Sequence, residues 1–165
     1  MKKLILDVGA GVHPKGEINV DIVLKSNIHV QCDALSLPFP DNSFQLVRSQ
    51  HVIEHVKAPY AFVKELTRVS SGYVYISCPN PHNFRTIIRD FLATHIRHYF
   101  EGHSAAELAN MFQYAGLEVL QTSFFIRETA VNINRKLDHI LKKWPRLNMR
   151  EVQILGKKKC VDDDR

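Results

Sequence analysis

Short apolar runs recur along the chain and are separated by longer segments of mixed polarity. They lie at residues 4–8, 18–21, 28–31, 44–49, 73–77, 117–125 and 152–155. Runs of this length predict β-strands, and several are apolar throughout, which is typical of strands covered on both faces of a sheet. The hydropathy pattern therefore predicts a sheet of about seven strands.

Segments with helical spacing lie between these runs. Residues 59–69 begin with Pro59, which the first turn of a helix tolerates. Its apolar positions are Ala61, Phe62, Leu66 and Val69. Ser104 and Glu107 have the spacing of a capping box, and Gly116 ends the helix that they begin. Its apolar stripe is Leu108, Met111, Phe112 and Ala115.

Two further helices are predicted at residues 83–93 and 131–144, the second amphipathic, basic and ended by Pro145. Strands that alternate with helices predict an α/β fold with a doubly wound, mostly parallel, Rossmann-like sheet. A chain of 165 residues without repeats or linkers is expected to form one domain, residues 1–165. Only about eight residues separate Val8 from Glu17, too few for a helical crossover. A loop at residues 12–16 is therefore expected in place of the first helix.

The composition, 45% hydrophobic and 24% charged, excludes the disordered, collagen-like and fibrous classes. No apolar run approaches the roughly 18 residues that cross a bilayer, and Asp7 comes too early for a signal peptide. We therefore expect a cytoplasmic protein without a membrane span, whose oligomeric state the sequence leaves open. The three cysteines, Cys32, Cys78 and Cys160, form no C-x-x-C pair and favour reduced thiols.

The formal net charge is +5, and the candidate nucleic-acid face is the basic stretch of residues 135–150. We favour the alternative interpretation, that this stretch is the solvated face of a helix.

Ligands of a parallel sheet bind beyond the carboxyl ends of the strands, near the point where the strand order reverses. Asp7 to Gly11 end the first predicted strand, Asp21 ends the second, Asp33 follows the third, and Gln50 with His51 follow the fourth. Gly9 and Gly11 let the backbone approach a ligand and direct N–H groups toward an anion. Pro14 stands where the dinucleotide fingerprint G-x-G-x-x-G has its third glycine, which argues against NAD or FAD.

Asp21 and Asp33 are candidate acceptors for a nucleoside. A carboxylate that ends the second strand can accept both ribose hydroxyls, and one after the third strand can accept an adenine amino proton. Each aspartate by itself is more typical of a turn or a cap. Their order along the chain, together with the glycines, is much more specific than either residue alone.

These segments resemble the class I S-adenosylmethionine-dependent methyltransferases, particularly the type-11 group. The resemblance is carried by LDVGAGVHP, INVD, CDALSLPFPDNSFQLVRSQHVIEHV and AGLEVL, over roughly residues 4–125. It implies S-adenosylmethionine as the cofactor, with its methionine end cradled by Asp7, Gly9, Ala10 and Gly11. It implies that the ribose is held by Asp21 and the adenine by Asp33, Ala34 and Leu35. The floor near the sulfonium would be Ser49, Gln50 and His51.

A general base is needed in methyl transfer only if the acceptor must lose a proton. His51, His55 and His82 are candidates because histidine titrates near neutral pH, and His51 is the predicted catalytic residue. The alternative for His51 is a hydrogen-bonded structural histidine.

No metal is expected. HVIEH at residues 51–55 matches the H-x-x-E-H pattern of inverted zinc peptidases, but it directly follows a predicted strand in a chain with no partner for a second peptidase domain. His95, His98 and His103 have no nearby carboxylate or thiolate that completes a metal site; they either help to build the acceptor pocket or cap the sheet. Cys78 is interpreted as a packed thiol at a strand end.

The sequence thus predicts an S-adenosylmethionine-dependent methyltransferase that acts on a small-molecule or glycan acceptor. Two alternatives remain. One is a non-catalytic domain of the same fold that binds an adenosine ligand or a partner and lost activity with the first helix. The other is a nucleic-acid methyltransferase that docks through its basic helix.

Overall fold

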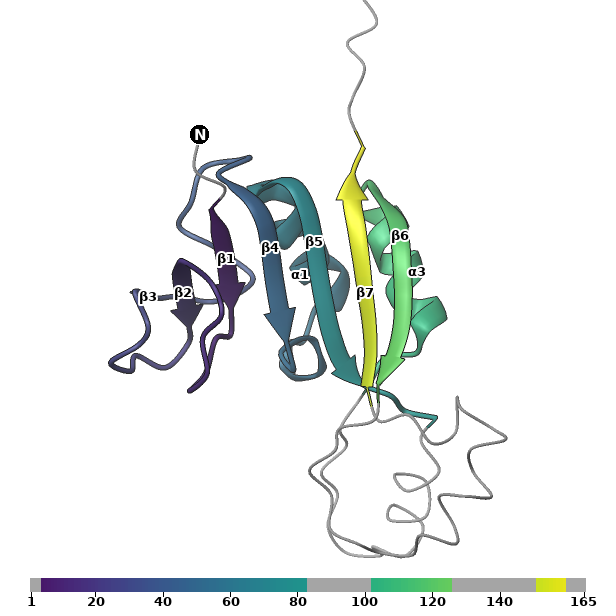
Figure 1. Cartoon of the computed structure of the whole chain (residues 1–165), viewed down its shortest axis with the longest axis horizontal. Coiled ribbons are helices and arrows are strands. Elements are labelled where there is room, and N and C mark those ends of the chain that lie inside the picture. The colour runs from purple at the N-terminus through teal and green to yellow at the C-terminus, as the bar shows by residue number, and fades with distance from the viewer. Residues whose placement is uncertain (1–3, 83–101, 126–150, 160–165) are drawn as a thin grey trace, which may run out of the picture.

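The structure, a computed structural model, describes residues 4–82, 102–125 and 151–159. They form a seven-stranded sheet with the order β3-β2-β1-β4-β5-β7-β6 (Figure 1). The strands are β1 (Ile5–Val8), β2 (Ile18–Asp21), β3 (Val30–Gln31), β4 (Phe44–Gln50), β5 (Ser70–Pro79), β6 (Leu117–Phe125) and β7 (Glu151–Lys158). The first five strands pair in parallel, and β7 runs antiparallel to both β5 and β6. The predicted α/β fold with a mostly parallel sheet of seven strands is confirmed.

Strand lengths depart from the prediction where polar residues join the hydrogen-bonding ladder. β5 extends three residues before and two beyond the predicted run of residues 73–77, and β7 likewise exceeds residues 152–155. These two strands pair from Tyr73 opposite Lys157 to Pro79 opposite Glu151. β3 is shorter than predicted and keeps only Val30 and Gln31. Backbone pairing with a neighbour therefore sets the strand ends, which side-chain periodicity does not report.

The helix α1 (Pro59–Val69) begins with a proline in its first turn, as predicted. Its buried face includes Phe62, Leu66 and Val69 of the predicted stripe together with Val63. Ala61 is exposed, so its place in the predicted stripe is wrong. The segment after β4 forms a short 3-10 helix, η1 (Ile53–His55), which the spacing did not predict.

The helix α3 (Ala105–Tyr114) begins at the predicted capping box. The Ser104 hydroxyl accepts from the Glu107 N–H at 3.2 Å, and the Ser104 N–H donates to Glu107 Oε2 at 2.7 Å. Gly116, with φ 82°, ends the helical stretch as predicted. Phe112 of α3 is fully buried against Gly156 of β7, where an added Cβ would lie 2.5 Å from the ring. The glycine in β7 thus provides the space for the largest buried side chain of the helix.

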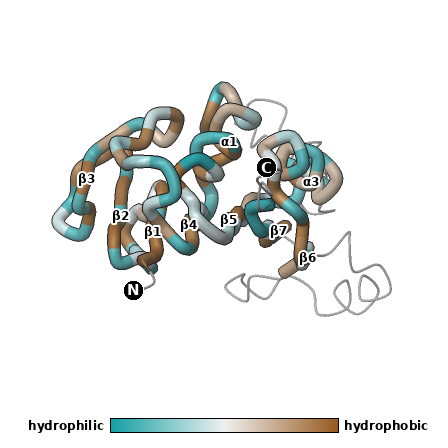
Figure 2. Tube along the Cα trace, turned by 90° about the horizontal axis from the view of Figure 1, so that it is seen from above, coloured by the Kyte–Doolittle hydropathy of each residue, from teal (hydrophilic) through white to brown (hydrophobic). Residues whose placement is uncertain are grey.

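The two described α-helices, α1 and α3, lie on the same face of the sheet (Figure 2). Residues 9–17 connect β1 to β2 without a helix, so the predicted loop in place of the first helix is confirmed. The predicted helices at residues 83–93 and 131–144 lie outside the described residues. Among the helices that are described, none is long and apolar enough to cross a membrane.

Replacing Phe112 with alanine tests this packing. We expect the free energy of unfolding to fall by about 3–5 kcal/mol, because the ring fills the space above Gly156 and its removal leaves a cavity. Gln113→Ala, on the exposed side of the same helix, should change it by less than about 0.5 kcal/mol. Urea unfolding followed by circular dichroism measures both variants. Equal effects would contradict the assigned core face of α3.

Candidate functional site

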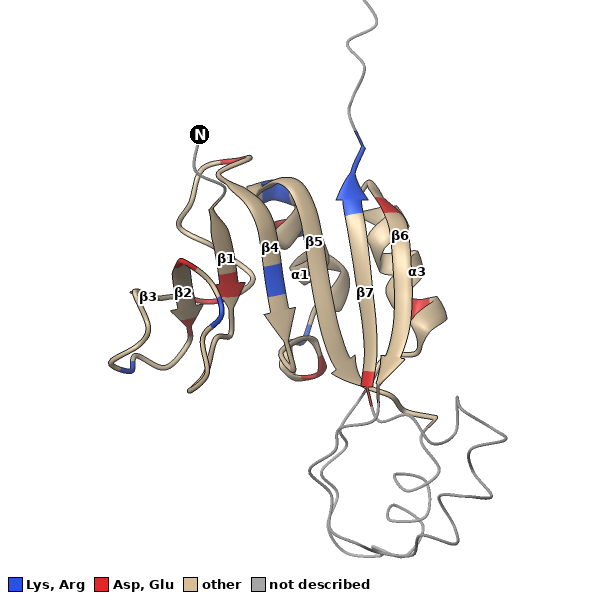
Figure 3. Ribbon diagram, in the orientation of Figure 1, with Lys and Arg blue, Asp and Glu red and all other residues tan. Residues whose placement is uncertain are grey.

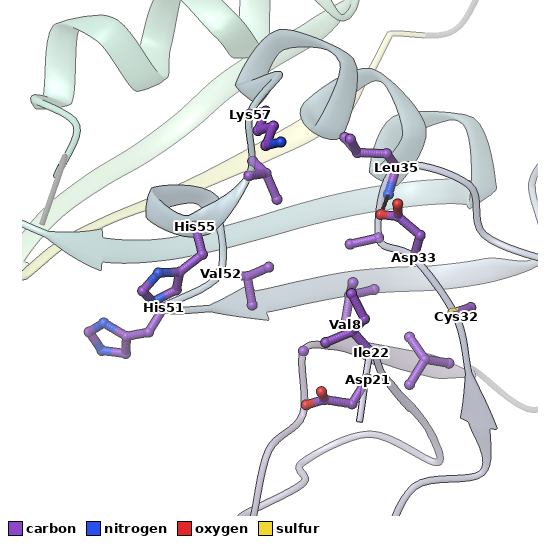
Figure 4. A pocket seen from close by; sticks show the side chains of 14 residues that line it. Val8, Asp21, Ile22, Cys32, Asp33, Leu35, His51, Val52, His55 and Lys57 are labelled. Carbon is purple, nitrogen blue, oxygen red and sulfur yellow. Dashed lines mark hydrogen bonds between the residues drawn. The ribbon is translucent and has the colours of Figure 1, made fainter. Parts of the chain in front are cut away.

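The order of the strands reverses at β1, which lies between β2 on one side and β4 on the other. In open parallel sheets, ligands bind beyond the carboxyl ends of the strands at such a point. A cavity of about 620 Å³ opens there (Figure 4). It is lined by Val8, Gly9, Val20, Asp21, Ile22, Cys32, Asp33, Ala34, Leu35, His51, Val52, His55, Val56 and Lys57. Its volume is within the range of about 300–1,000 Å³ that is usual for small-molecule sites.

The loop after β1 turns through two left-handed glycines, Gly9 with φ 69° and Gly11 with φ 58°. The N–H groups of Gly9 and Ala10 both donate to the carbonyl of Val20, at 2.8 and 3.1 Å. A Cβ on Gly9 would collide with the side chain of Val52 across the cavity, whereas one on Gly11 would meet nothing within 4 Å. Gly9 is therefore required both by its backbone conformation and by the close approach of Val52.

Asp21 ends β2 with its carboxylate at the cavity (Figure 4). Oδ2 accepts from the Gly11 N–H at 2.9 Å, and Oδ1 accepts from the Val23 N–H at 3.0 Å. Asp33 lies beyond β3, and its Oδ1 accepts from the Leu35 N–H at 2.9 Å. A carboxylate offers about four lone-pair positions, so both side chains keep capacity for donors from a ligand.

His51 follows β4 with a left-handed backbone, φ 55°, and its ring lies between two carboxylates. Nδ1 is 3.3 Å from Oε1 of Glu54, and Nε2 is 3.2 Å from Oε1 of Glu151, which belongs to β7. Hydrogen bonds to Glu151 and then to Glu54 raise the pKa of His51 to about 9, although burial opposes the shift. A pKa raised in this way favours the protonated ring at neutral pH.

The cavity brings together six of the predicted site residues: Gly9, Asp21, Asp33, Ala34, Leu35 and His51. Asp7, Ala10, Gly11, Ser49 and Gln50 do not line it. Asp7 is buried, its Oδ2 accepts from the Lys15 N–H at 2.7 Å, and Oδ1 is 3.6 Å from Arg48 Nε. Burial raises the pKa of Asp7, against the lowering by these two contacts.

Ser49 and Gln50 are also held by neighbouring strands. The Ser49 hydroxyl donates to the Val8 carbonyl at 2.9 Å, and Gln50 Nε2 is 3.5 Å from the Tyr75 hydroxyl. Side chains alternate between the two faces of a strand. Residues that are adjacent in sequence to the cavity-lining residues therefore do not all point into the cavity.

Sequence reasoning missed seven lining residues: Val8, Val20, Ile22, Cys32, Val52, Val56 and Lys57. Two of them, Val52 and Val56, stand within the motif HVIEHV, so their position in the motif was an available signal. No signal in the sequence pointed to Glu151, which contacts His51. This residue comes from the last strand, one hundred positions further along the chain.

Two chemical alternatives can be assessed from the same geometry. Among the residues that the structure describes, no group of three or more His, Cys, Asp and Glu could hold a metal ion. Cys78 is fully buried, and burial raises the pKa of its thiol to about 12, so it is not a reactive nucleophile. Of the histidines at 95, 98 and 103, the first two lie outside the described residues.

Residues 14–76 match the model of a protein family described as a methyltransferase domain. Ajmaline N-methyltransferase of Rauvolfia serpentina is 43% identical over 51 residues, which are 30% of this chain. The aligned segment spans only 18% of that relative's length.

Solved structures share the fold over nearly the whole chain. A methyltransferase of Thermotoga maritima, dependent on S-adenosylmethionine and described as a possible histamine N-methyltransferase, has a TM-score of 0.66 at 21% identity. The match covers 96% of this chain and 84% of that one. Magnesium protoporphyrin IX methyltransferase of Synechocystis, solved with bound S-adenosylhomocysteine, has a TM-score of 0.64 at 12% identity, covering 95% and 74%. At these identities the likeness shows the fold alone.

The two left-handed glycines provide a matched test of the cavity wall. Gly11→Ala should cost about 1–2 kcal/mol of unfolding free energy, which is the cost of a left-handed L-residue in open space. Gly9→Ala should cost more, because the added Cβ also strikes Val52. The extra cost should shrink in a Val52→Ala background, as a double-mutant cycle measured by chemical denaturation would show. Equal costs for the two single variants would refute the close approach of Val52 to Gly9.

Proposed function

We propose that the chain is a class I S-adenosylmethionine-dependent methyltransferase that binds S-adenosylmethionine in the described cavity and methylates a small-molecule or glycan acceptor. The observation that carries this proposal is the convergence of Gly9, Asp21 and Asp33 on one cavity at the switch point of the sheet. These residues come from three different strand ends, and together they match the donors and acceptors of an adenosyl group.

The chemistry of the cavity fits this cofactor. In our proposal, the Asp21 carboxylate accepts the ribose hydroxyls, since each of its oxygens already takes one backbone N–H and has a lone pair left. Asp33 accepts the adenine amino proton through Oδ2. Ala34 and Leu35 supply apolar contacts to the base from the same wall. The left-handed turn at Gly9 leaves room for the backbone to lie close to the cofactor.

The methionine end is assigned to the loop from Asp7 to Gly11. Asp7 acts there indirectly, because its carboxylate holds the Lys15 N–H and so fixes the far end of the loop. Ser49 acts in the same way by holding the carbonyl of Val8 next to Gly9. Gln50 lies at the end of β4, where its Nε2 is 3.5 Å from the Tyr75 hydroxyl. In this proposal, these side chains position the backbone and are not themselves ligands.

S-adenosylmethionine supplies an electrophilic methyl group bound to a sulfonium. The task of the protein is to hold the acceptor in line with that group and to exclude water. Val8, Val20 and Val52 give the cavity an apolar wall suited to this exclusion. A proton that leaves the acceptor is not taken by His51 at neutral pH, since both ring nitrogens already face carboxylates.

One relative supports a small-molecule acceptor, because it is described as ajmaline N-methyltransferase. The basic stretch of residues 135–150, on which a nucleic-acid acceptor would depend, lies outside the described residues.

Titration calorimetry with S-adenosylmethionine and S-adenosylhomocysteine tests the cofactor assignment. The wild-type chain should bind both, and Asp21→Asn should weaken binding by about tenfold or more, because hydrogen bonds to a charged acceptor contribute about 1.5–3 kcal/mol. Asp41→Asn is the matched control, since Asp41 is exposed and pairs with Arg68 away from the cavity. Failure of the wild-type chain to bind either compound at millimolar concentration would overturn the proposal. Binding without methyl transfer to any amine, hydroxyl or glycan acceptor would favour the non-catalytic alternative.

A further inference from the structure

His51, the first residue after β4, contacts two other strands, β5 and β7. The His51 N–H donates to the Ser77 carbonyl of β5 at 2.9 Å, while its ring contacts Glu151 of β7 at 3.2 Å. The second oxygen of Glu151 accepts from the Ser77 hydroxyl at 3.3 Å. Glu54 of η1 contacts the other ring nitrogen at 3.3 Å. His51 is thus held by contacts from three separate elements.

The geometry of the two ring contacts favours the protonated ring. A neutral imidazole carries one N–H, so its other nitrogen would point a lone pair at a carboxylate. Only the imidazolium donates to both. The Glu54 side chain is 2% exposed and that of Glu151 is 14% exposed, so both anions are largely removed from water. Loss of the proton would remove the cation that these two largely buried carboxylates share, which is unfavourable.

The position of His51 in turn sets the wall of the cavity. The next residue, Val52, lies so close to Gly9 that a Cβ on the glycine would collide with it. The left-handed backbone of His51 directs the chain toward this contact. In a residue other than glycine, this conformation persists only where surrounding contacts hold it. A shift of His51 therefore moves Val52 relative to the glycine turn.

We propose that Glu151, together with Glu54, keeps His51 as an imidazolium and that this ion cluster is a positioning device for the cofactor cavity, holding Val52 against Gly9. Glu151 is a positioning residue that acts through His51. The inference rests on the proposed function only in the experiment that measures cofactor binding.

Among the described residues, the surrounding elements carry several other titratable or charged groups. They are Arg48 on β4, His55 on η1, Tyr73, Tyr75 and Cys78 on β5, Lys157 and Lys158 on β7, and Asp21, Cys32, Asp33 and Lys57 at the cavity. The causes that shift the pKa of His51 are Glu151, Glu54 and burial, so these two carboxylates dominate its titration.

The first experiment follows the imidazole signals of the free protein by NMR as the pH is raised, with His51→Gln used to assign the resonance. The His51 signal should remain that of the cation through neutral pH and titrate near pH 9. Glu151→Gln should lower this midpoint toward the ordinary value of about 6.5. Glu118→Gln, which removes an exposed carboxylate from the adjoining strand β6, should leave it unchanged. A wild-type midpoint near 6.5 overturns the proposal.

The second experiment measures the affinity for S-adenosylhomocysteine against pH. A group whose pKa is raised in the folded state contributes while it is charged and is lost as the pH passes that value. Wild-type affinity should therefore be level from pH 7 to 8 and fall severalfold above pH 9. In Glu151→Gln the fall should begin at least one pH unit lower, while Glu118→Gln should follow the wild type.

The outcomes separate the two proposals. If the wild type binds no S-adenosylhomocysteine at any pH, the proposed function fails, and the NMR titration still decides the state of His51. If it binds and the Glu151→Gln and Glu118→Gln profiles coincide, the positioning role fails while the function stands. Should Glu151→Gln not fold, Glu151→Asp and the wild-type titration carry the test.

Discussion

The parallel pairing of β1 with both β2 and β4 is the constraint on which the site depends. Val8 lies opposite Val20 on one side and Ser49 on the other. Because these strands point the same way, the residues just beyond them meet at one edge of the sheet. Gly9, Asp21 and His51 come from three separate segments and share a cavity for that reason.

The short connection after β1 alters how this edge is stabilised. A crossover helix after β1 would end the loop with the N–H groups of its first turn. In this chain, side chains hydrogen-bond to the loop backbone instead. Asp21 accepts from the Gly11 N–H, Asp7 accepts from the Lys15 N–H, and Asn27 Nδ2 donates to the Gly11 carbonyl at 3.1 Å. These bonds satisfy backbone groups that would otherwise be unpaired. The loop can therefore form the glycine turn without a crossover helix.

The antiparallel strand β7 connects the end of the described chain to the site. It lies between β5 and β6, and its register places Glu151 opposite Pro79, at the carboxyl edge of β5. At its other end, Lys158 Nζ donates to the carbonyls of Thr67 and Ser70, both at 2.9 Å. β7 is thus fixed to the core at one end and contacts the cavity wall through His51 at the other.

The sequence by itself determined the features that depend on neighbours along the chain. The strands, the α3 capping box, the loop after β1 and the acidic residues at strand ends could all be predicted, because spacing and local hydrogen bonding decide them. Only the tertiary structure decided which strand-end side chains face the cavity. Asp7 and Ser49 turn to backbone contacts instead. The protonation of His51 depends on Glu151, and no local pattern relates residues so far apart, because strand register alone brings them together.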